Sequence, residues 1–526
     1  MTAITGATRH PTETSAQDDA RSIFAHALER VLPEPALRRY VSLDETTNTL
    51  AVAGRAYDLR RFERIVVVGG GKAARRTGAE LASILGDRIT AGALNVYQDQ
   101  AAEPFSERIQ LFAADHPTPN EEGVRGARRM VELLRGADER TLVIALISGG
   151  GSSLMALPAE GISLQDYRDI SSLLLTVPAT IDEINAVRKH IDPLKGGGMR
   201  KFASRAGGFI SLVLSDVPVT KTGIVDDPSV IASGPTVGDD STFQTAKDVL
   251  TGHGIWDRAP RAVREYIEAN LGREENETLA KDSPLLSADR SQYVIIANND
   301  QAMEAAGEKA RELGYTVHLV GWQTGTTDDK IKTEVTREIE RIWQAITPHL
   351  ADTDRVTFAS FSTDGVDGHS NLAGAIAATD TLRVARRLGL DHKGYLARYD
   401  SATFFEKLGL GIETGPTGTN VADLSLVLVT NPHNPYRKVA FVFGGEATVK
   451  VELPSGQKPG RGGRNTHLAL LAAERMDPMD ETRNRLDSEA VKRGLIEAGI
   501  SASQIEISPV GLLGYASDVG PISLTP

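Results

Sequence analysis

The amino-acid sequence predicts an α/β fold with two domains. The first is built on a Rossmann-like parallel sheet with helices on both faces, and the second is a smaller α/β unit. Three apolar runs, at residues 64–68, 141–147 and 209–214, lead into loops rich in glycine, serine or aspartate. Apolar strands that alternate with helical patterns are typical of parallel sheets covered on both faces. Glycine supplies 50 of the 526 residues, which suits a chain with many tight turns between such elements.

The order of the other patterns predicts the domain division. Residues 1–19 are polar and are predicted to be a flexible tail, and residues 20–31 carry apolar side chains at helical spacing. A polar stretch at 273–289 predicts a linker, so we place the first domain at 20–285 and the second at 286–526. The second domain is expected to start with a strand at 293–297, followed by a helical stretch and five more strands, with the helix at 328–345 and the strands near 316–320, 356–361, 424–429, 439–443 and 510–513.

The composition argues against several classes of protein. With 70 acidic and 58 basic residues the net charge is −12, which is unlike the basic footprint of a nucleic-acid-binding protein. The sequence has no cysteine, which excludes disulfides, thiolate catalysis and cysteine-bound metal centres within it. We see neither an apolar leader nor a run of about 18 apolar residues, so we expect a cytoplasmic protein without a membrane span.

Two glycine-rich loops follow predicted strands of the first domain. Gly69-Gly70-Gly71-Lys72 lacks the spacing of a P-loop and, read on to Ala74, matches only a weak variant of the dinucleotide-binding pattern. A lysine at a helix N-terminus faces the positive end of the helix dipole, an unfavourable position unless an anion lies between them. Residues 148–153, Ser-Gly-Gly-Gly-Ser-Ser, offer backbone N–H groups and hydroxyls to an anion. We interpret both loops as phosphate-binding, with a simple tight turn as the alternative.

Charged residues in the rest of the first domain predict further parts of a site. Arg188, Lys189 and Lys195 form a basic island beside the glycines at 196–198, which favours an anion site over a solvated charge run. Asp216 follows the strand at 209–214, and Asp227 lies in the next loop. Carboxylates at strand ends are typical ligands of Mg²⁺ beside phosphates, although each could equally cap a turn.

The second domain adds four glycine- or threonine-rich loops, at residues 363–368, 415–420, 444–449 and 460–465. The last places Arg461 and Arg464 among glycines before an apolar helix, where arginine would stabilise charge on a transferring phosphoryl group. His116, which precedes Pro117, is either a turn residue or a functional group. Neither a nucleophile elbow nor an HExxH zinc motif is present.

Together these loops resemble the motifs of the class II glycerate kinases, the ATP-dependent glycerate 2-kinase family whose C-terminal part is called the MOFRL domain. The matching motifs lie at residues 68–74, 116–120, 148–154, 184–190, 214–216, 227–236, 363–368, 415–420, 444–449 and 460–465. The resemblance implies two α/β domains, the second MOFRL-like, with the active site in the cleft between them. It implies transfer of the γ-phosphoryl group of ATP to D-glycerate, giving 2-phosphoglycerate, with Mg²⁺. It also implies catalytic roles for Lys72 and Arg464.

The chain departs from the family pattern in three places. In the family, the motifs found here at 444–449 and 460–465 precede the other two motifs of the C-terminal domain, so this domain is expected to be internally permuted. Residues 510–521 faintly echo the displaced strand. A permuted chain can fold where the rejoined ends are close in space. In addition, Thr466-His467 replaces the usual Gln-Glu after Arg464, and the loop at 217–226 is longer than usual.

These patterns assign roles to named residues. Catalytic roles go to Lys72, Arg464 and Asp216, and either Asp216 or Asp364 is the base for the C2 hydroxyl. The residues expected to bind substrate or phosphate are Gly70, Gly71, Ser148, Gly149, Gly150, Gly151, Ser152, Asn185, Arg188, Lys189 and Lys195. Those expected to contact the nucleotide are Ser233, Gly234, Thr236, Thr417, Asn420, Gly445 and Glu446. Mg²⁺ is assigned to Asp216, Asp227 and Asp364.

The expected partners are therefore glycerate and a nucleotide, with no nucleic acid and no membrane, and a homodimer is left open. Two alternative functions remain. One is a hydroxypyruvate reductase-type oxidoreductase. The variant dinucleotide-binding pattern that begins at Gly69 favours this function, whereas the absence of a ribose-binding acidic residue argues against it. The other is a catalytically impaired homologue that binds a nucleotide or sugar acid.

Overall fold

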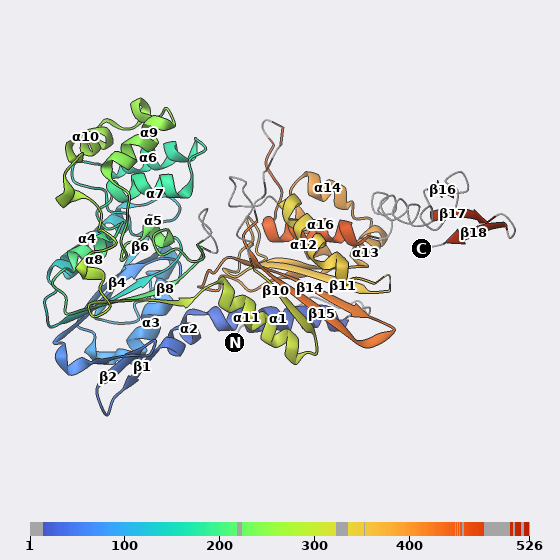
Figure 1. Ribbon diagram of the computed structural model, residues 1–526, viewed down its shortest axis with the longest axis horizontal. Coiled ribbons are helices and arrows are strands. Elements are labelled where there is room, and N and C mark those ends of the chain that lie inside the picture. Colours follow the sequence, from blue (N-terminus) through green and yellow to red (C-terminus); the bar gives the residue numbers. More distant parts are fainter. Residues whose placement is uncertain are drawn as a thin grey trace.

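The computed structural model describes residues 14–217, 224–321, 335–351, 353–447, 449, 451, 453–454 and 457–477, and the backbone of 505–508, 511–516 and 520–524. Two six-stranded sheets with their helices form two halves of the molecule, at the left and the centre of Figure 1. The predicted α/β fold, with a parallel sheet in its first part, is confirmed.

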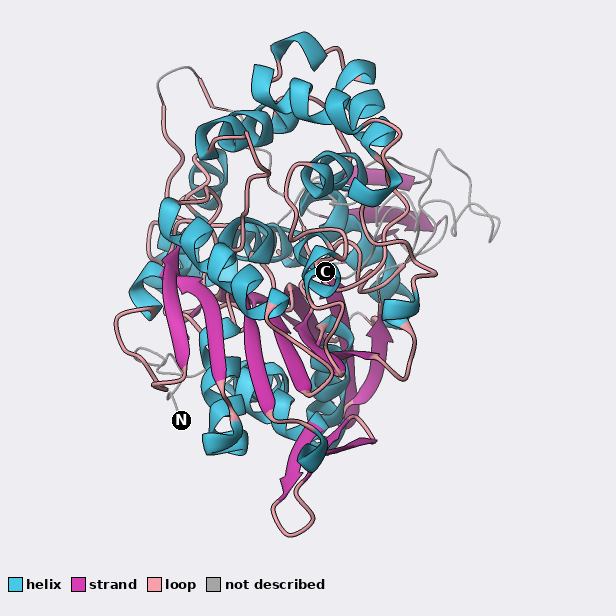
Figure 2. Cartoon of the chain, turned by 90° about the vertical axis from the view of Figure 1, so that its left-hand side faces the viewer, coloured by secondary structure: helices cyan, strands magenta, loops and turns pink. Residues whose placement is uncertain are grey.

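The first sheet is entirely parallel, with strand order β6-β5-β4-β7-β8-β9. Its strands are β4 (Arg64–Gly70), β5 (Ala91–Tyr97), β6 (Ile109–Ala114), β7 (Thr141–Ile147), β8 (Gly208–Leu214) and β9 (Ser291–Ala297). Val67 packs into one hydrophobic core and its neighbours Val66 and Val68 into another, because helices cover both faces of the sheet (Figure 2). The carboxyl ends of β4, β7 and β8 consequently carry their loops to the same edge, where ligands bind in such sheets.

Helices of the first half position these loops. The helices nearest the sheet are α3 (Ala74–Leu85), α4 (Glu121–Arg135), α5 (Gly151–Leu154) and α8 (Gly198–Phe202). Four more pack around a hydrophobic core of their own at the upper left of Figure 1, namely α6 (Leu164–Leu175), α7 (Ile181–His190), α9 (Phe243–Gly252) and α10 (Arg261–Asn270). A capping box of Thr180 and Glu183 begins α7, the helix that carries the predicted basic segment.

The second sheet is mixed, with strand order β10-β15-β14-β11-β12-β13 and one parallel pair, β10 with β15. Its strands are β10 (Thr316–Val320), β11 (Arg355–Ser362), β12 (Gly374–Ala378), β13 (Gly411–Ile412), β14 (Asp423–Asn431) and β15 (Asn434–Gly445). Helices α1 (Thr14–Val31) and α11 (Asn299–Glu312) share a core with one face. The other face packs against α12 (Val335–Ile346), α13 (Thr381–Arg387), α14 (His392–Ala397), α15 (Ser401–Leu408) and α16 (Arg464–Met476).

Smaller elements complete the chain. Helix α2 (Pro33–Tyr40) leads into a small antiparallel sheet of β1 (Val41–Asp44), β2 (Thr49–Val52) and β3 (Arg55–Asp58). The expected strand at 510–513 coincides largely with β17 (Gly511–Ala516), which pairs with β16 (Ile505–Ser508) and β18 (Gly520–Leu524) in a separate sheet. Within the described ranges, every helix is too short or too polar to span a bilayer.

Two expectations about the chain's organisation are wrong. The strand at 293–297 does not begin the second half, because β9 pairs with β8 and completes the first sheet. An apolar run indicates that a strand is buried but not which sheet it joins. The polar stretch at 273–289 before this strand therefore does not separate the two sheets. The predicted tail is also partly ordered, since α1 begins at Thr14 and packs on the second sheet through Phe24. The described part of the helix expected at 328–345 is α12.

The strand order of the second sheet brings the C-terminal motifs close together. β15 lies between β10 and β14, and a short turn joins β14 to β15 as an antiparallel hairpin. The segments that the expected permutation would rejoin are therefore neighbours in the sheet, which is the condition that such a permutation must meet. Helix α16 follows and covers β11 and β12.

Replacing Phe24 by alanine tests the attachment of α1 to the second sheet. Phe24 is fully buried and its ring contacts Phe361 of β11, so we expect the variant to unfold with a free energy lower by about 3–5 kcal/mol. Urea denaturation would measure this, with Glu29→Ala on the exposed face of α1 as the control. Equal stability of the two variants would contradict this packing.

Candidate active site at the junction of the two sheets

An ion pair joins the loop edges of the two halves. Lys72, directly after β4, places its Nζ 3.4 Å from Oδ2 of Asp364, which follows β11. Both side chains are about one-quarter exposed, at 23% and 24%, so the pair is partly accessible to solvent rather than enclosed within a core. This contact brings together two residues that are 292 positions apart in the sequence.

The two glycine loops of the first half are locked to each other by backbone contacts. The N–H of Lys72 donates to the carbonyl of Gly149 at 2.9 Å, and the N–H of Ala73 donates to Oγ of Ser148 at 3.0 Å. Gly71 has a φ of 137°, and any side chain there would collide with Ser148. Glycine at position 71 is therefore required for the close approach that sets the position of Lys72.

The remaining glycines form the edges of the same two loops. Gly70 ends β4, and its carbonyl accepts a hydrogen bond from the N–H of Ser148 at 3.4 Å. Gly150 has a φ of 79° and precedes Gly151, the first residue of α5. The backbone at Gly150 passes next to Lys72, since a Cβ there would be 3.4 Å from Cγ of Lys72.

Asp216 lies between the glycine loops of the first half and the residues of the second half. Asp216 comes after β8 in the sequence. Its carboxylate lies so close to Gly149 that any side chain at position 149 would collide with it. From the other half, Nδ2 of Asn420 lies 3.4 Å from Oδ2 of Asp216. The predicted residues Lys72, Asp216, Asp364 and Asn420 thus meet at one place.

The charges at this junction keep Lys72 protonated. Burial alone would lower the pKa of Lys72, but the negative charges of Asp364 and Asp216 raise it overall. Tyr97, which ends β5, is a neighbour that the sequence analysis did not identify. Burial also raises the pKa of Tyr97, so its phenol stays neutral.

A hydroxyl–amide chain links the second glycine loop to α7. Oγ of Ser152 lies 2.8 Å from Oγ of Ser233, which donates to Oδ1 of Asn185 at 2.9 Å. Among the described residues, the buried Nδ2 of Asn185 and Oγ1 of Thr236 have no hydrogen-bond partner. Gly234 allows the sharp turn after Ser233 with a φ of 61°. Unsatisfied buried polar atoms are costly and mark this turn as a place that a ligand or water would complete.

Two predicted anion-binding lysines have a structural role instead. Nζ of Lys189 pairs with Asp239 at 2.5 Å and Nζ of Lys195 pairs with Asp192 at 2.5 Å, and all four side chains are buried. Each ammonium is neutralised by an aspartate of the same chain, so the prediction that both lysines bind an anionic ligand is wrong. Arg188 differs, because its half-buried side chain has no hydrogen bond or ion pair with any residue that the structure describes.

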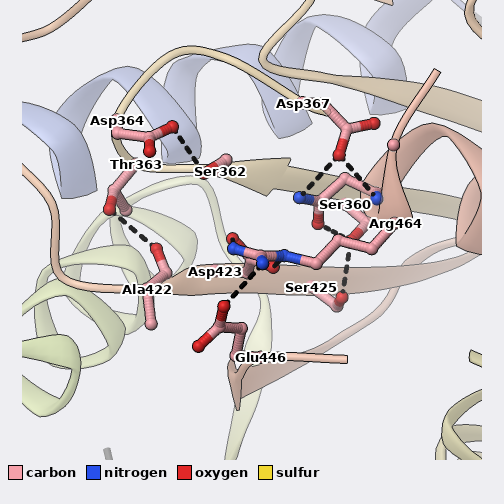
Figure 3. Close-up of polar contacts among 12 residues, drawn as sticks. Ser360, Ser362, Thr363, Asp364, Asp367, Ala422, Asp423, Ser425, Glu446 and Arg464 are labelled. Carbon is pink, nitrogen blue, oxygen red and sulfur yellow. Dashed lines mark hydrogen bonds and ion pairs between the residues drawn. The ribbon is translucent and has the colours of Figure 1, made fainter. Parts of the chain in front are cut away.

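Arg464 binds two carboxylates in the second half. Its Nε and Nη2 hydrogen-bond Asp423, the first residue of β14, and its Nη1 is 2.5 Å from Oε1 of Glu446 (Figure 3). Glu446 follows Gly445, which ends β15 with a φ of 147°. Burial raises the pKa of Asp423 to about 6 against the opposing effect of Arg464. Arg464 therefore ties the hairpin to α16.

Asp367 fixes the beginning of α16 next to this cluster. Its carboxylate accepts hydrogen bonds from the N–H groups of Asn465 at 3.0 Å and Thr466 at 2.7 Å. Oγ1 of Thr466 accepts from the N–H of Gly463 at 3.1 Å, which gives this departure from the family pattern a capping role. Burial lowers the pKa of His467 to about 4, so its imidazole is neutral.

The loop at 415–420 bridges the halves from the other side. Oγ1 of Thr417 donates to the carbonyl of Thr363 at 2.6 Å, and the carbonyl of Thr417 accepts from Arg76 of α3. Arg76 is held in turn by Glu34 of α2. The Thr417 side chain thus orders the loop, while Asn420 faces Asp216.

The three predicted magnesium ligands do not form one cluster. Asp227 accepts the N–H of Ser229 at 2.8 Å and caps its own turn. No group of three potential ligands among His, Cys, Asp and Glu occurs in the described part of the chain. Asp216 and Asp364 remain near Lys72, and Mg²⁺ bound with phosphates commonly takes only one or two protein carboxylates. The residues present at the junction therefore fit such an ion.

Comparison with known proteins identifies relatives over most of the chain. A model of a domain of unknown function, DUF4147, matches residues 19–268, and a model of the MOFRL family matches residues 330–423. The chain is 32% identical over 450 residues to "Glycerate 2-kinase" of Pyrococcus horikoshii, covering 78% of this chain and 96% of that protein. It is also 32% identical over 393 residues to a "Putative hydroxypyruvate reductase" of Agrobacterium vitis, covering 70% and 99%.

A solved structure agrees with these relatives. The crystal structure of glycerate kinase from Thermotoga maritima matches with a TM-score of 0.64 and 29% identity, covering 78% of this chain and 99% of that chain. The MOFRL match ends at residue 423, before the motifs at 444–449 and 460–465. The chain therefore belongs to the glycerate kinase family with a MOFRL domain.

Proposed function

We propose that the protein transfers the γ-phosphoryl group of ATP to the C2 hydroxyl of D-glycerate, releasing ADP and 2-phosphoglycerate. The observation that carries the proposal is the Lys72–Asp364 pair, which places one ammonium between two glycine-rich loops and the carboxylates of both halves. Phosphoryl transfer needs mainly positioning and charge neutralisation from a protein, and this junction offers both.

The first half supplies the groups for anions. The N–H groups of the loops at 69–72 and 148–153 would cradle phosphates, with Ser152 as an additional donor. Arg188 is the guanidinium available for the glycerate carboxylate, which its planar fork fits. Ser233 and Asn185 would hold Ser152 in place, and Gly234 and Thr236 complete that turn.

The second half would supply a carboxylate for the metal ion and the residues that hold the strand ends in position. Asp364 and Asp216 would hold Mg²⁺, which neutralises phosphate charge when bound. Arg464 already binds Asp423 and Glu446, so we assign it the positioning of the strand ends that carry Asn420 toward Asp216. Lys72 is the residue that would neutralise the transferring phosphoryl group.

A nicotinamide-dependent reductase fits the site less well, although one relative carries that name. A dinucleotide site needs an acidic residue at the end of the second strand for the ribose, and β5 ends at Tyr97. Lys72 lies within the variant glycine pattern, and its ammonium is paired with the carboxylate of Asp364.

Glycerate-dependent release of ADP tests the function. We expect turnover by the wild-type protein and a loss of at least about 100-fold in kcat for Lys72→Ala, because the charge opposite the phosphoryl group is removed. Lys281→Ala, at an exposed ion pair, is the matched control and should retain full activity. Direct coupling to enolase distinguishes 2-phosphoglycerate from 3-phosphoglycerate. NADH-dependent reduction of hydroxypyruvate without ATP-dependent consumption of glycerate would refute the proposal.

Two arginines of the same loop test the positioning role of Arg464. Arg464→Ala leaves the buried Asp423 without its cation, and we expect the free energy of unfolding to fall by about 3–5 kcal/mol. Arg461→Ala breaks an exposed pair with Glu406 and should cost less than about 1 kcal/mol. Urea denaturation compares them, and equal losses would be inconsistent with a clamp at Arg464.

A further inference from the structure

His116 lies beside the proposed phosphate loop although no role has been given to it. It follows β6 and is exposed. A Cβ built on Gly150 would be 3.3 Å from Cδ2 of His116, the ring atom bonded to Nε2, and 3.4 Å from Cγ of Lys72. The imidazole and the Lys72 side chain therefore flank the same glycine in the middle of the 148–153 loop.

The charged groups around His116 are cationic. Lys72 approaches from the loop after β4 and Arg188 from α7, and both act electrostatically on the imidazole. The Tyr97 ring meets the imidazole edge-on, with 6.3 Å between ring centroids. The adjacent Asp115 carboxylate is turned away, toward Gln98 at 2.6 Å and Asn120 at 3.0 Å. Partial desolvation and the two cations lower the pKa of His116. The imidazole is thus neutral near pH 7.

The two carboxylates considered as bases have other partners. Asp364 binds Lys72 and accepts hydrogen bonds from Ser362 at 2.8 Å and from the N–H of Val366 at 3.1 Å. Asp216 contacts Asn420 and is assigned to the metal ion. His116, by contrast, has no hydrogen bond or ion pair with any residue in the described ranges.

We propose that His116 is the general base that accepts the proton of the substrate hydroxyl. This inference rests on the proposed kinase function. As the hydroxyl oxygen forms its bond to the γ-phosphorus, the bond from that phosphorus to the bridging oxygen of ADP breaks and ADP leaves. The hydroxyl proton passes to the unprotonated imidazole nitrogen, and the exposed imidazolium then releases it to water. Arg188, on the same side, would hold the carboxylate of the 2-hydroxy acid.

The pH dependence follows from the direction of the pKa shift. The base must be neutral, so kcat/KM should fall with unit slope as the pH decreases through a midpoint below the ordinary histidine value of 6.5. His116→Asn should lower kcat/KM by about 100- to 10,000-fold and remove this acid limb. His433→Asn, on the exposed hairpin turn, is the control that should change neither.

A second variant, His116→Ala, tests whether any loss of activity comes from a loss of folding. ATP affinity and thermal unfolding of His116→Ala should match the wild type, and free imidazole should restore part of its turnover. Turnover by His116→Asn within twofold of wild type, or a reduced rate that keeps the same acid limb, overturns the base assignment while the kinase proposal stands. Absence of glycerate-dependent ADP release in the wild-type protein refutes the kinase proposal and the base assignment with it.

Discussion

The contact between Lys72 and Asp364 is the interaction around which the two halves of this protein are arranged. It joins the carboxyl edge of a parallel sheet to the end of a strand in a mixed sheet. Asn420 with Asp216, and Arg76 with Thr417, cross the same junction. A partly solvent-accessible ion pair contributes little to stability by itself, so the position of Lys72 also depends on these neighbouring contacts and on the glycine loops next to it.

In the second half, strand pairing brings together motifs from separate parts of the sequence. Hydrogen bonding between β14 and β15 places Glu446 next to Asp423. Arg464 then joins both carboxylates, and Asp367 caps the helix that carries it. Each carboxylate of this partly buried cluster has a cationic or N–H partner, which offsets the cost of removing it from water.

Much of this could be predicted from the sequence because glycine loops after apolar strands are local patterns. The positions of Lys72, Asp216 and the 148–153 loop follow from them, and the structure brings these together with Asp364. Local patterns could not reveal that Lys189 and Lys195 are neutralised by Asp239 and Asp192, since pairing depends on tertiary contacts. Tyr97 and Asp423 belong to no sequence motif. The apolar sequence of β9 is compatible with either sheet, so it does not indicate which sheet the strand joins.

A crystal structure with D-glycerate, Mg²⁺ and a non-hydrolysable ATP analogue tests the central claim most directly. The account predicts the terminal phosphate between Lys72 and the 148–153 loop, with the glycerate carboxylate on Arg188 and its C2 hydroxyl facing His116. Ligands bound away from the Lys72–Asp364 junction, with that ion pair undisturbed, would contradict it.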